Sequence, residues 1–467
     1  MFQLCLAPIS AVILLSSFAV PALPQSTDSD SAILQRLDQL EKQNQELRQQ
    51  IEQLRQQVKA NAQEKSAQTA APPSNTPTVA PPSASESQEQ TENEHEAVDE
   101  HRIEELAQTK VEASQRFPIK LTGELLFNAF TNSAYGGGAE DPTYASATSG
   151  ARSSGATLRQ TVLGLSFHGP QTFLGGTVSG SLYMDFFGGT YGTPNPLLRL
   201  RLATVQLDWT NTTFAVGQDK PLVSRREPNS FAQVGVSPLT NAGNPWLWRP
   251  QARIEQRFHL TDSTTISAEA GVFETKESSY QSEYAMTGVE SARPALEVRV
   301  NLKHQFGGER VIEIAPVFHT STSHVLGQSI PSRLYGADWL VKPMAQVEVT
   351  GMIFHGQNFA NLGALGGFTV LPGEQVVAVH GSGGWAQIRY LATKKLSFDW
   401  YGGQQDNRNR DLISGAIAKN QYYAVNTMYL LAPNVVAAFE VGRARTNYLG
   451  LGNRLNTHYD LALAYLF

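Results

Sequence analysis

The clearest alternation of hydrophobic and polar positions lies at the carboxyl end of the chain, in residues 453–467. Side chains of a β-strand point alternately to its two faces. One face is largely apolar and consists of Leu455, Thr457, Tyr459, Leu461, Leu463, Tyr465 and Phe467. The other is mostly polar or small and consists of Arg454, Asn456, His458, Asp460, Ala462, Ala464 and Leu466. This pattern predicts a strand with one face in lipid and one in water, because lipid-facing and lumen-facing residues alternate in transmembrane barrels.

Similar segments recur from residue 117 onward, and we count sixteen of them. They cover residues 117–131, 155–168, 173–187, 197–210, 212–218, 251–260, 264–274, 293–306, 310–320, 332–341, 344–355, 383–393, 395–405, 419–432, 434–448 and 453–467. The connectors between them alternate long and short until the last pair. Short turns at one end and long loops at the other are typical of bacterial outer-membrane barrels. The chain is therefore predicted to be all-β, with a 16-stranded antiparallel transmembrane β-barrel in residues 117–467.

The charged positions of these segments agree with a wet interior. In 293–306, four aliphatic residues alternate with Glu, Arg, Asn and Lys. A charge facing lipid at mid-bilayer costs about 2–4 kcal/mol, so these charges must face the lumen. Two segments break the alternation, 155–168 near Arg159 and 197–210 between Leu202 and Val205. The second break predicts a bulge and leaves the direction of Arg199 and Arg201 open.

The amino-terminal part has a different character. The apolar run 4–20, followed by Pro21 and Ala22, predicts a signal peptide in residues 1–22. No Lys or Arg precedes Arg36, so the usual basic start of such a peptide is missing. Residues 61–116 are acidic and rich in Pro, Ala, Ser and Thr, which predicts a disordered linker.

Between the two, residues 31–60 carry an uninterrupted heptad pattern. Its a and d positions are Ile33, Leu37, Leu40, Asn44, Leu47, Ile51, Leu54 and Val58. The pattern predicts a coiled-coil helix in the periplasm, and β-branched residues at a with Leu at d favour two strands. A lone amphipathic helix is the alternative, although it would be only marginally stable in water.

Composition narrows the class of protein. Charged residues are only 17% of the chain, and the mean hydropathy of −0.26 excludes a helical membrane protein. Residues 1–116 carry a net charge of −8 and residues 117–467 of +2, so neither part is basic enough to predict a nucleic-acid partner. The only cysteine is Cys5, within the predicted signal peptide.

The longest connector, 219–250, is the candidate for the segment that narrows the lumen and selects solutes. In porins, which this layout resembles, the loop after the fifth strand folds into the lumen. The basic residues of this region are Lys220, Arg225, Arg226, Arg249, Arg253 and Arg257, and Glu255 and Arg299 are expected to shape the lumen. A basic ring in a narrow pore favours anions, because the low-dielectric wall focuses the field. The alternative is a solvated surface loop whose arginines bind lipopolysaccharide phosphates or nothing. Trp246 and Trp248 either form an apolar surface beside the basic groups or pack at the loop base or the membrane interface.

Short motifs then resemble one family, the DcaP-like trimeric outer-membrane porins. They are Phe214-Ala215-Val216-Gly217-Gln218, Arg249-Pro250-Gln251-Ala252-Arg253, Ala432-Pro433-Asn434, Phe439-Glu440-Val441-Gly442-Arg443 and Asn453-Arg454. The resemblance implies a homotrimer that passes small anionic solutes such as dicarboxylates, which differs from the two strands that the heptads favour. Asp219-Lys220-Pro221 departs from the family, which usually has an aromatic residue and a Ser there.

Enzyme motifs are missing from the sequence, with neither Gly-x-Ser-x-Gly nor a Walker motif nor a zinc-spaced cluster. We therefore expect no catalysis, no cofactor and no metal. The expected function is passive diffusion of small anions through the outer membrane, in contact with its lipid. The alternatives are a phosphate-selective type of porin, a plugged barrel that serves as a periplasmic tether, and a lipid-acting enzyme.

Overall fold

A computed structural model describes residues 119–189, 196–275 and 289–467. The predicted signal peptide (1–22), coiled coil (31–60) and linker (61–116) lie outside the described residues. Within the described ranges, no helix combines the length and hydropathy of a membrane span. The helical elements of these ranges are the short 3₁₀ turns η1 (Phe173–Gly175), η2 (Ala360–Leu362) and η3 (Asn409–Asp411).

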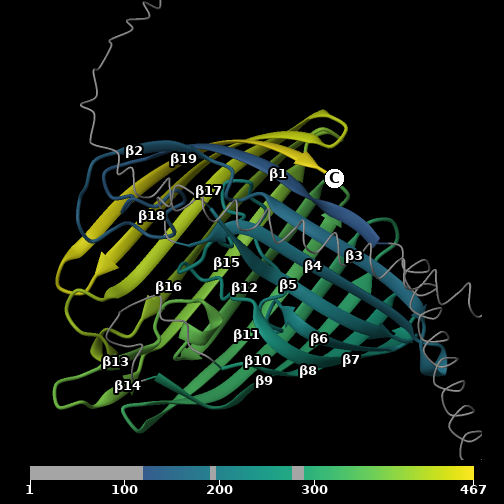
Figure 1. The fold of residues 1–467 in the computed structure, drawn as a ribbon, viewed down its shortest axis with the longest axis horizontal. Coiled ribbons are helices and arrows are strands. Elements are labelled where there is room, and N and C mark those ends of the chain that lie inside the picture. Colours follow the sequence, from purple (N-terminus) through teal and green to yellow (C-terminus); the bar gives the residue numbers. More distant parts are fainter. Residues whose placement is uncertain (1–118, 190–195, 276–288) are drawn as a thin grey trace, which may run out of the picture. The chain divides into compact units, whose positions relative to one another are not determined.

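The described strands build one large antiparallel sheet. Its members are β1 (Ile119–Asn132), β2 (Ser153–Thr157), β3 (Val162–Gln171), β4 (Thr177–Gly188), β5 (Leu197–Asp208), β6 (Thr212–Asp219), β7 (Arg249–Thr261), β8 (Thr264–Phe273), β9 (Val289–Gln305), β10 (Val311–Val325), β11 (Gln328–Met344), β12 (Val347–Gln357), β15 (His380–Leu391), β16 (Leu396–Asn407), β17 (Ile417–Ala432), β18 (Val435–Tyr448) and β19 (Gly452–Leu466). Sequence neighbours pair with each other, and β1 also pairs with β19, so the sheet closes into a barrel (Figure 1). The small hairpin β13 (Phe368–Val370) and β14 (Val376–Ala378) stands apart in the connection after β12.

The sheet contains the sixteen strands that the sequence predicts. Both β2 and β3 pair with β1 and are separated by residues 158–161, so together they form one interrupted strand. At the interruption, Arg159, Gln160 and Thr161 are all buried, while Leu158 is exposed. The break therefore explains why the alternation fails near Arg159.

The second break in the alternation is the predicted bulge. Tyr183 of β4 stands opposite Leu202, but the next residue, Met184, stands opposite Leu200. Arg201 is thus the extra residue on β5. With one residue skipped, Arg199 and Arg201 both reach the buried carboxylate of Asp185 inside the barrel.

One predicted loop is wrong. The sequence predicts a long connection over residues 321–331, but β10 and β11 continue across it and meet in a tight turn. Leu326 and Gly327 both have positive φ (50° and 71°), as the twist of a two-residue hairpin turn requires. The lumen-facing residues here, such as Ser321 and Ser323, are polar and buried, so the strand pattern persists without the apolar signal that marks it elsewhere.

The two faces of the strands confirm the alternation. On β19, Leu461, Leu463 and Tyr465 are exposed on the outer face, whereas Ala462 and Ala464 are buried inside. The longer connections lie at one end of the barrel and include residues 133–152, 220–248 and 358–379. The connections at the other end are all short, and the turns 326–327 and 449–451 are the short exceptions at the first end, so this layout matches the two ends of an outer-membrane barrel.

Candidate functional site

The connection 220–248 is folded into the barrel and is held by its wall. Near its start, the backbone N–H of Leu222 donates to Glu297 Oε2 on β9 at 2.7 Å. In its middle, the carbonyl of Phe231 accepts from Asn128 Nδ2 on β1 at 2.7 Å. The two anchors belong to strands that are well separated around the barrel wall, so the loop spans part of the barrel interior.

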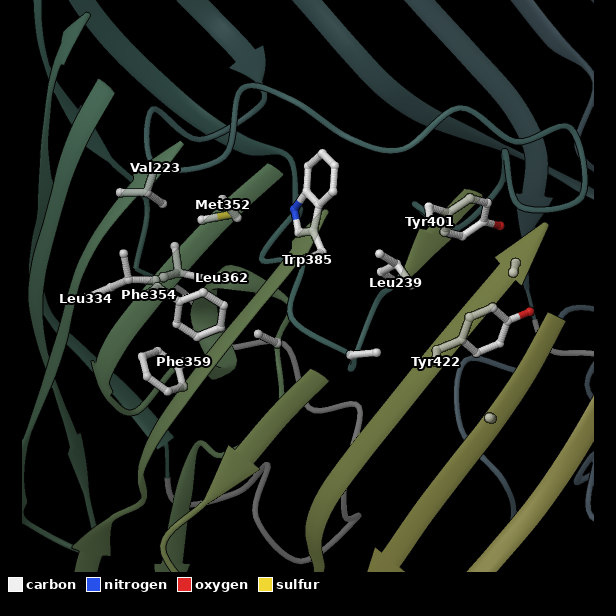
Figure 2. Packing of buried hydrophobic residues seen from close by; sticks show 14 of the residues in the cluster. Val223, Leu239, Leu334, Met352, Phe354, Phe359, Leu362, Trp385, Tyr401 and Tyr422 are labelled. Atoms are coloured by element: carbon white, nitrogen blue, oxygen red, sulfur yellow. The ribbon is translucent and has the colours of Figure 1, made fainter. Parts of the chain in front are cut away.

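Apolar contacts hold the same loop against other strands. Val223 and Leu239 of the loop belong to a buried cluster with Met352 of β12, Trp385 of β15 and Tyr401 of β16. Figure 2 shows these wall side chains pointing toward the loop. Fully burying an aliphatic side chain of this size contributes about 1.5–3 kcal/mol, so the loop is a fixed part of the barrel interior.

Arg225 and Arg226 lie in the first part of this loop and bind carboxylates of the wall. Arg225 donates to Glu269 Oε2 of β8 at 2.7 Å, and Arg226 Nε donates to Asp338 Oδ1 of β11 at 3.2 Å. Arg226 also pairs with Glu313 of β10. Each arginine is therefore charge-compensated rather than isolated.

These contacts belong to one network, which we call the ion-pair chain. Its members alternate in sign in the order Arg253, Asp219, Arg225, Glu269, Arg299, Asp338, Arg226, Glu313 and Lys303. It joins the loop to β6–β11 and contains one more cation than carboxylate. The structure thus brings together four predicted site residues, Arg225, Arg226, Arg253 and Arg299.

Three of the five cations in the ion-pair chain are its most exposed members, whereas Arg253 and Arg299 are only 10% and 6% exposed. The side chains of Lys303, Arg226 and Arg225 are 42%, 23% and 20% exposed. The four carboxylates are only 2–15% exposed. A solute in the lumen therefore meets ammonium and guanidinium groups before it meets their acidic partners.

Lys220 lies next to the network and pairs within the loop. Its Nζ is 2.5 Å from Glu227 Oε1, and the other oxygen of Glu227 accepts from the Ser237 hydroxyl at 2.6 Å. Burial acts to raise the pKa of Glu227, but the charge and hydrogen bond of Lys220 and the hydrogen bond of Ser237 outweigh it. The pKa of Glu227 is therefore lowered, and the carboxyl stays ionised at neutral pH.

The other predicted site residues lie elsewhere. Arg249 is buried and donates to the carbonyl of Asn361 at 2.8 Å, which ties the loop end to the connection after β12. Arg257 donates to Glu255 Oε2 at 3.2 Å and to the carbonyl of Trp209 at 3.1 Å. Trp209 belongs to the short turn between β5 and β6, so Arg257 and Glu255 lie toward the opposite end of the barrel and do not join the ion-pair chain.

A second basic group was not predicted. Arg199 and Arg201 bind Asp185 at 2.6 and 2.9 Å and also the carbonyls of Gly235 and Val234 in the loop. Both guanidinium groups lie over the ring of Trp248, at 5.2 and 4.5 Å. The signal was present in the sequence as the parity break on β5, but only the register shows that both side chains point inward.

Trp246 and Trp248 pack at the loop base. Their rings meet edge to face at 5.0 Å, and both are 8% exposed in a cluster with Phe187 and Val236. The sequence leaves the position of these two tryptophans open, and the structure shows that they pack at the loop base.

A second set of carboxylates, which we call the carboxylate side, lies on β16–β19. It consists of Asp399, Glu440 and Asp460, which are only 0–3% exposed. Glu440 accepts from the neutral groups Tyr401 OH and Ser230 Oγ, both at 2.6 Å. Because Ser230 belongs to the loop 220–248, the loop itself covers this carboxylate.

A further buried carboxyl lies in the connection 133–152. Asp141 is 2% exposed, and among the described residues neither of its oxygens has a hydrogen-bond partner. Burial first, and then the neighbouring charge of Glu140, raise the pKa of Asp141 well above its ordinary value. In the described ranges no cluster of three His, Cys, Asp or Glu side chains has the geometry of a metal site.

The fold is shared with solved outer-membrane channels. The barrel is similar to the outer membrane channel DcaP of Acinetobacter baumannii, with 16% sequence identity and a TM-score of 0.62 over 75% of this chain and 97% of that one. It is also similar to an anion-selective porin from Comamonas acidovorans, with 11% identity and a TM-score of 0.50 over 75% of this chain and all of that one. No known protein family and no curated protein matches the chain by sequence. The likeness confirms the porin-type barrel that the short motifs suggest.

Proposed function

We propose that the chain is an outer-membrane porin through which small solutes, preferentially anions such as dicarboxylates, diffuse passively. The observation that carries this proposal is the exposure within the ion-pair chain. Arg225, Arg226 and Lys303 face water more than any of the carboxylates they bind. A water-accessible layer of cations in a narrow lumen attracts anions.

The pairing of the arginines explains how an anion could bind and still leave. A guanidinium group has five N–H donors, and the carboxylates of the ion-pair chain use only some of them. The free donors of Arg225 and Arg226 can bind a passing carboxylate with two parallel hydrogen bonds. Because Glu269, Glu313 and Asp338 already compensate most of the charge, the attraction remains weak, as conduction requires.

The proposal involves no covalent chemistry and no cofactor, so we infer that the chain is not an enzyme. Its setting is the outer membrane, with the apolar outer face in lipid and the predicted coiled coil (31–60) in the periplasm. A homotrimer is part of the proposal, supported by the sequence resemblance to the DcaP-like porins. A similar barrel forms the anion-selective porin from Comamonas acidovorans, which is compatible with the proposed preference.

The test is a reversal-potential measurement across a salt gradient in planar bilayers, for the natural protein and for the double variant R225Q/R226Q. Each charge is worth about 1 kcal/mol at about 4 Å in bulk water. Removing two cations also leaves Glu269, Glu313 and Asp338 with fewer partners. We therefore expect the anion-to-cation permeability ratio to fall by about tenfold or more.

The control is R257Q, which removes one guanidinium group outside the ion-pair chain and should lower the ratio much less than the double variant does. An unchanged ratio in R225Q/R226Q would disprove the role of these arginines even in a conducting barrel. A barrel without conductance steps would instead favour the tether, and lipid hydrolysis by the purified protein would favour the lipid-acting enzyme. If phosphate blocks the current at far lower concentration than succinate does, the phosphate-selective type of porin replaces the dicarboxylate channel.

A further inference from the structure

Charged side chains interrupt the apolar outer face of the barrel at one place on β18. The outward positions at the short-turn end of this strand are apolar and include Phe439 and Val441. The next two outward positions are Arg443 and Arg445, and both are exposed, while Ala444 between them is fully buried. The two arginines therefore point away from the lumen, toward the surroundings of the barrel.

The neighbouring strands extend this group into a patch. Arg445 stands opposite Gln421 of β17, and Asn447 stands between Lys419 of β17 and Asn453 of β19. We call this group the outer polar patch: Lys419, Gln421, Arg443, Arg445, Asn447 and Asn453. A surface depression of about 430 Å³ lies over it, lined by all of these residues except Arg443 and completed by Asp406, Asn409 and Ala418.

The two arginines differ from those of the lumen in having no partner. Lys419 pairs with Asp406 at 3.0 Å, and Asn447 donates to Asn453 at 3.2 Å. Within the described part of the chain, Arg443 and Arg445 have neither an ion pair nor a hydrogen bond from their guanidinium groups. Two adjacent, unpaired cations on the outer face of a membrane barrel call for an anion from outside the protein.

The patch lies where the apolar band of the outer face ends. Toward the short-turn end it is followed by exposed Tyr423 and Val425 on β17, Phe439 on β18 and Leu461 on β19. On the other side the strands end at the connections 408–416 and 449–451, at the same end of the barrel as the long loops. The cost of a lipid-facing arginine falls steeply from the midplane to the interface, so this position corresponds to the head-group level of the outer leaflet.

We infer that the outer polar patch binds the phosphorylated head group of an outer-leaflet glycolipid. Two guanidinium forks on one strand match phosphate oxygens, which arginine binds with paired hydrogen bonds. The amides of Gln421, Asn447 and Asn453 offer donors and acceptors for sugar hydroxyls. The acyl chains would then lie on Tyr423 and Phe439. The inference rests on the proposed outer-membrane setting, but not on the proposed anion preference.

The test uses the full-length protein and two probes, diphosphoryl lipid A and the same lipid A without its phosphates. Native mass spectrometry of protein released from mixed micelles measures how much of each lipid stays bound. Charge-assisted hydrogen bonds are roughly twice as strong as neutral ones. We expect the natural protein to retain the phosphorylated lipid about tenfold better, the variant R443Q/R445Q to lose this preference, and R443K/R445K to keep part of it.

The matched control is R333Q, which removes a single exposed outward arginine on β11 and should leave lipid retention unchanged. Equal retention of the two lipids, or an equal loss in R333Q, would overturn the inference. So would displacement of the lipid by millimolar inorganic phosphate, which indicates a site for free anions. Retained lipid but a smaller oligomer in R443Q/R445Q would make this face a contact with a second copy instead.

The conductance of the same preparations separates this inference from the proposed function. Because Arg443 and Arg445 point outward, R443Q/R445Q should conduct like the natural protein, which also shows that the variant is folded. A natural protein that binds the phosphorylated lipid but shows no conductance steps would refute the porin and leave the lipid site standing.

Discussion

The two sides of the lumen hold their carboxylates in different ways. In the ion-pair chain, each of Asp219, Glu269, Glu313 and Asp338 binds at least one Arg or Lys. On the carboxylate side, Glu440 is bound by hydroxyls and an amide, and Asp460 by the amide of Asn128 at 2.9 Å. Asp399 has one cation nearby, Arg389, at 3.7 Å. One side therefore holds compensated charges, and the other holds acids among mostly neutral groups.

The route of the loop 220–248 decides which of these charges a solute meets. Ser230 and Asn229 bind Glu440 and Asn426 on the carboxylate side, so the loop covers that side. The partly exposed residues Arg225 and Arg226 come earlier in the same loop. The described barrel contains acidic groups on both sides, and its expected preference for anions depends on what the loop covers rather than on the sum of the charges.

The largest effect is expected when the part of the loop that covers the carboxylate side is replaced. We replace residues 229–240 by Gly and Ser at equal length, which keeps Arg225, Arg226 and the anchor of Leu222 on Glu297. Three newly exposed carboxylates at about 1 kcal/mol each should lower the anion-to-cation permeability ratio by at least about tenfold and raise the conductance. Reversal potentials and single-channel conductance in planar bilayers measure both.

The control for this replacement is a Gly and Ser substitution of equal length in residues 368–378, which contain the hairpin β13 and β14. That hairpin forms its own small sheet, so the permeability ratio should stay the same. A loop replacement that leaves the ratio unchanged would show that the loop does not shield the carboxylates.

The same chemical change on the two sides should affect stability unequally. Asp338 is 2% exposed and binds Arg299 at 2.8 Å and Arg226 at 3.2 Å, so D338N breaks the pair with buried Arg299 and leaves it only Glu269 as a carboxylate partner. Breaking a buried pair in this way costs about 3–5 kcal/mol of the free energy of unfolding. In E440Q the amide can still accept from Ser230 or Tyr401, so we expect a loss of about 1 kcal/mol. Urea unfolding in lipid vesicles measures both variants, and equal losses would contradict the distinction between the two sides.

The fold is largely predictable from the sequence because lipid and water impose opposite requirements on alternate residues. All sixteen strands follow from that alternation, and the bulge at Arg201 follows from its failure. The turn at Leu326 and Gly327 was missed because the ends of β10 and β11 carry small polar residues on the lumen side. Such residues do not distinguish a strand from a loop.

The site is less predictable because its contacts join residues that are far apart in the sequence. Arg299 binds Asp338, 39 residues later on a strand that is not its neighbour, and Ser230 binds Glu440, 210 residues later. Alternation shows that these side chains face the lumen, but not which ones meet across it. The basic residues of the loop could therefore be named, while their acidic partners, and the separate position of Arg257, required the structure.

The smallest expected effect comes from Glu227, the acid that pairs with Lys220 inside the loop. At neutral pH, E227Q removes one negative charge from the loop inside the lumen. At about 8 Å in water such a charge is worth about 0.5 kcal/mol, so the anion-to-cation permeability ratio should rise about twofold.

Because the pKa of Glu227 is lowered, its contribution to stability is present above the ordinary carboxyl pKa and is lost only as the pH falls through the lowered value. The natural protein should therefore reach the ratio of E227Q only in acid below the ordinary carboxyl range. Reversal potentials of both proteins over a pH series test this, and a rise centred at or above the ordinary carboxyl pKa would show that Lys220 does not hold Glu227 in its ionised form.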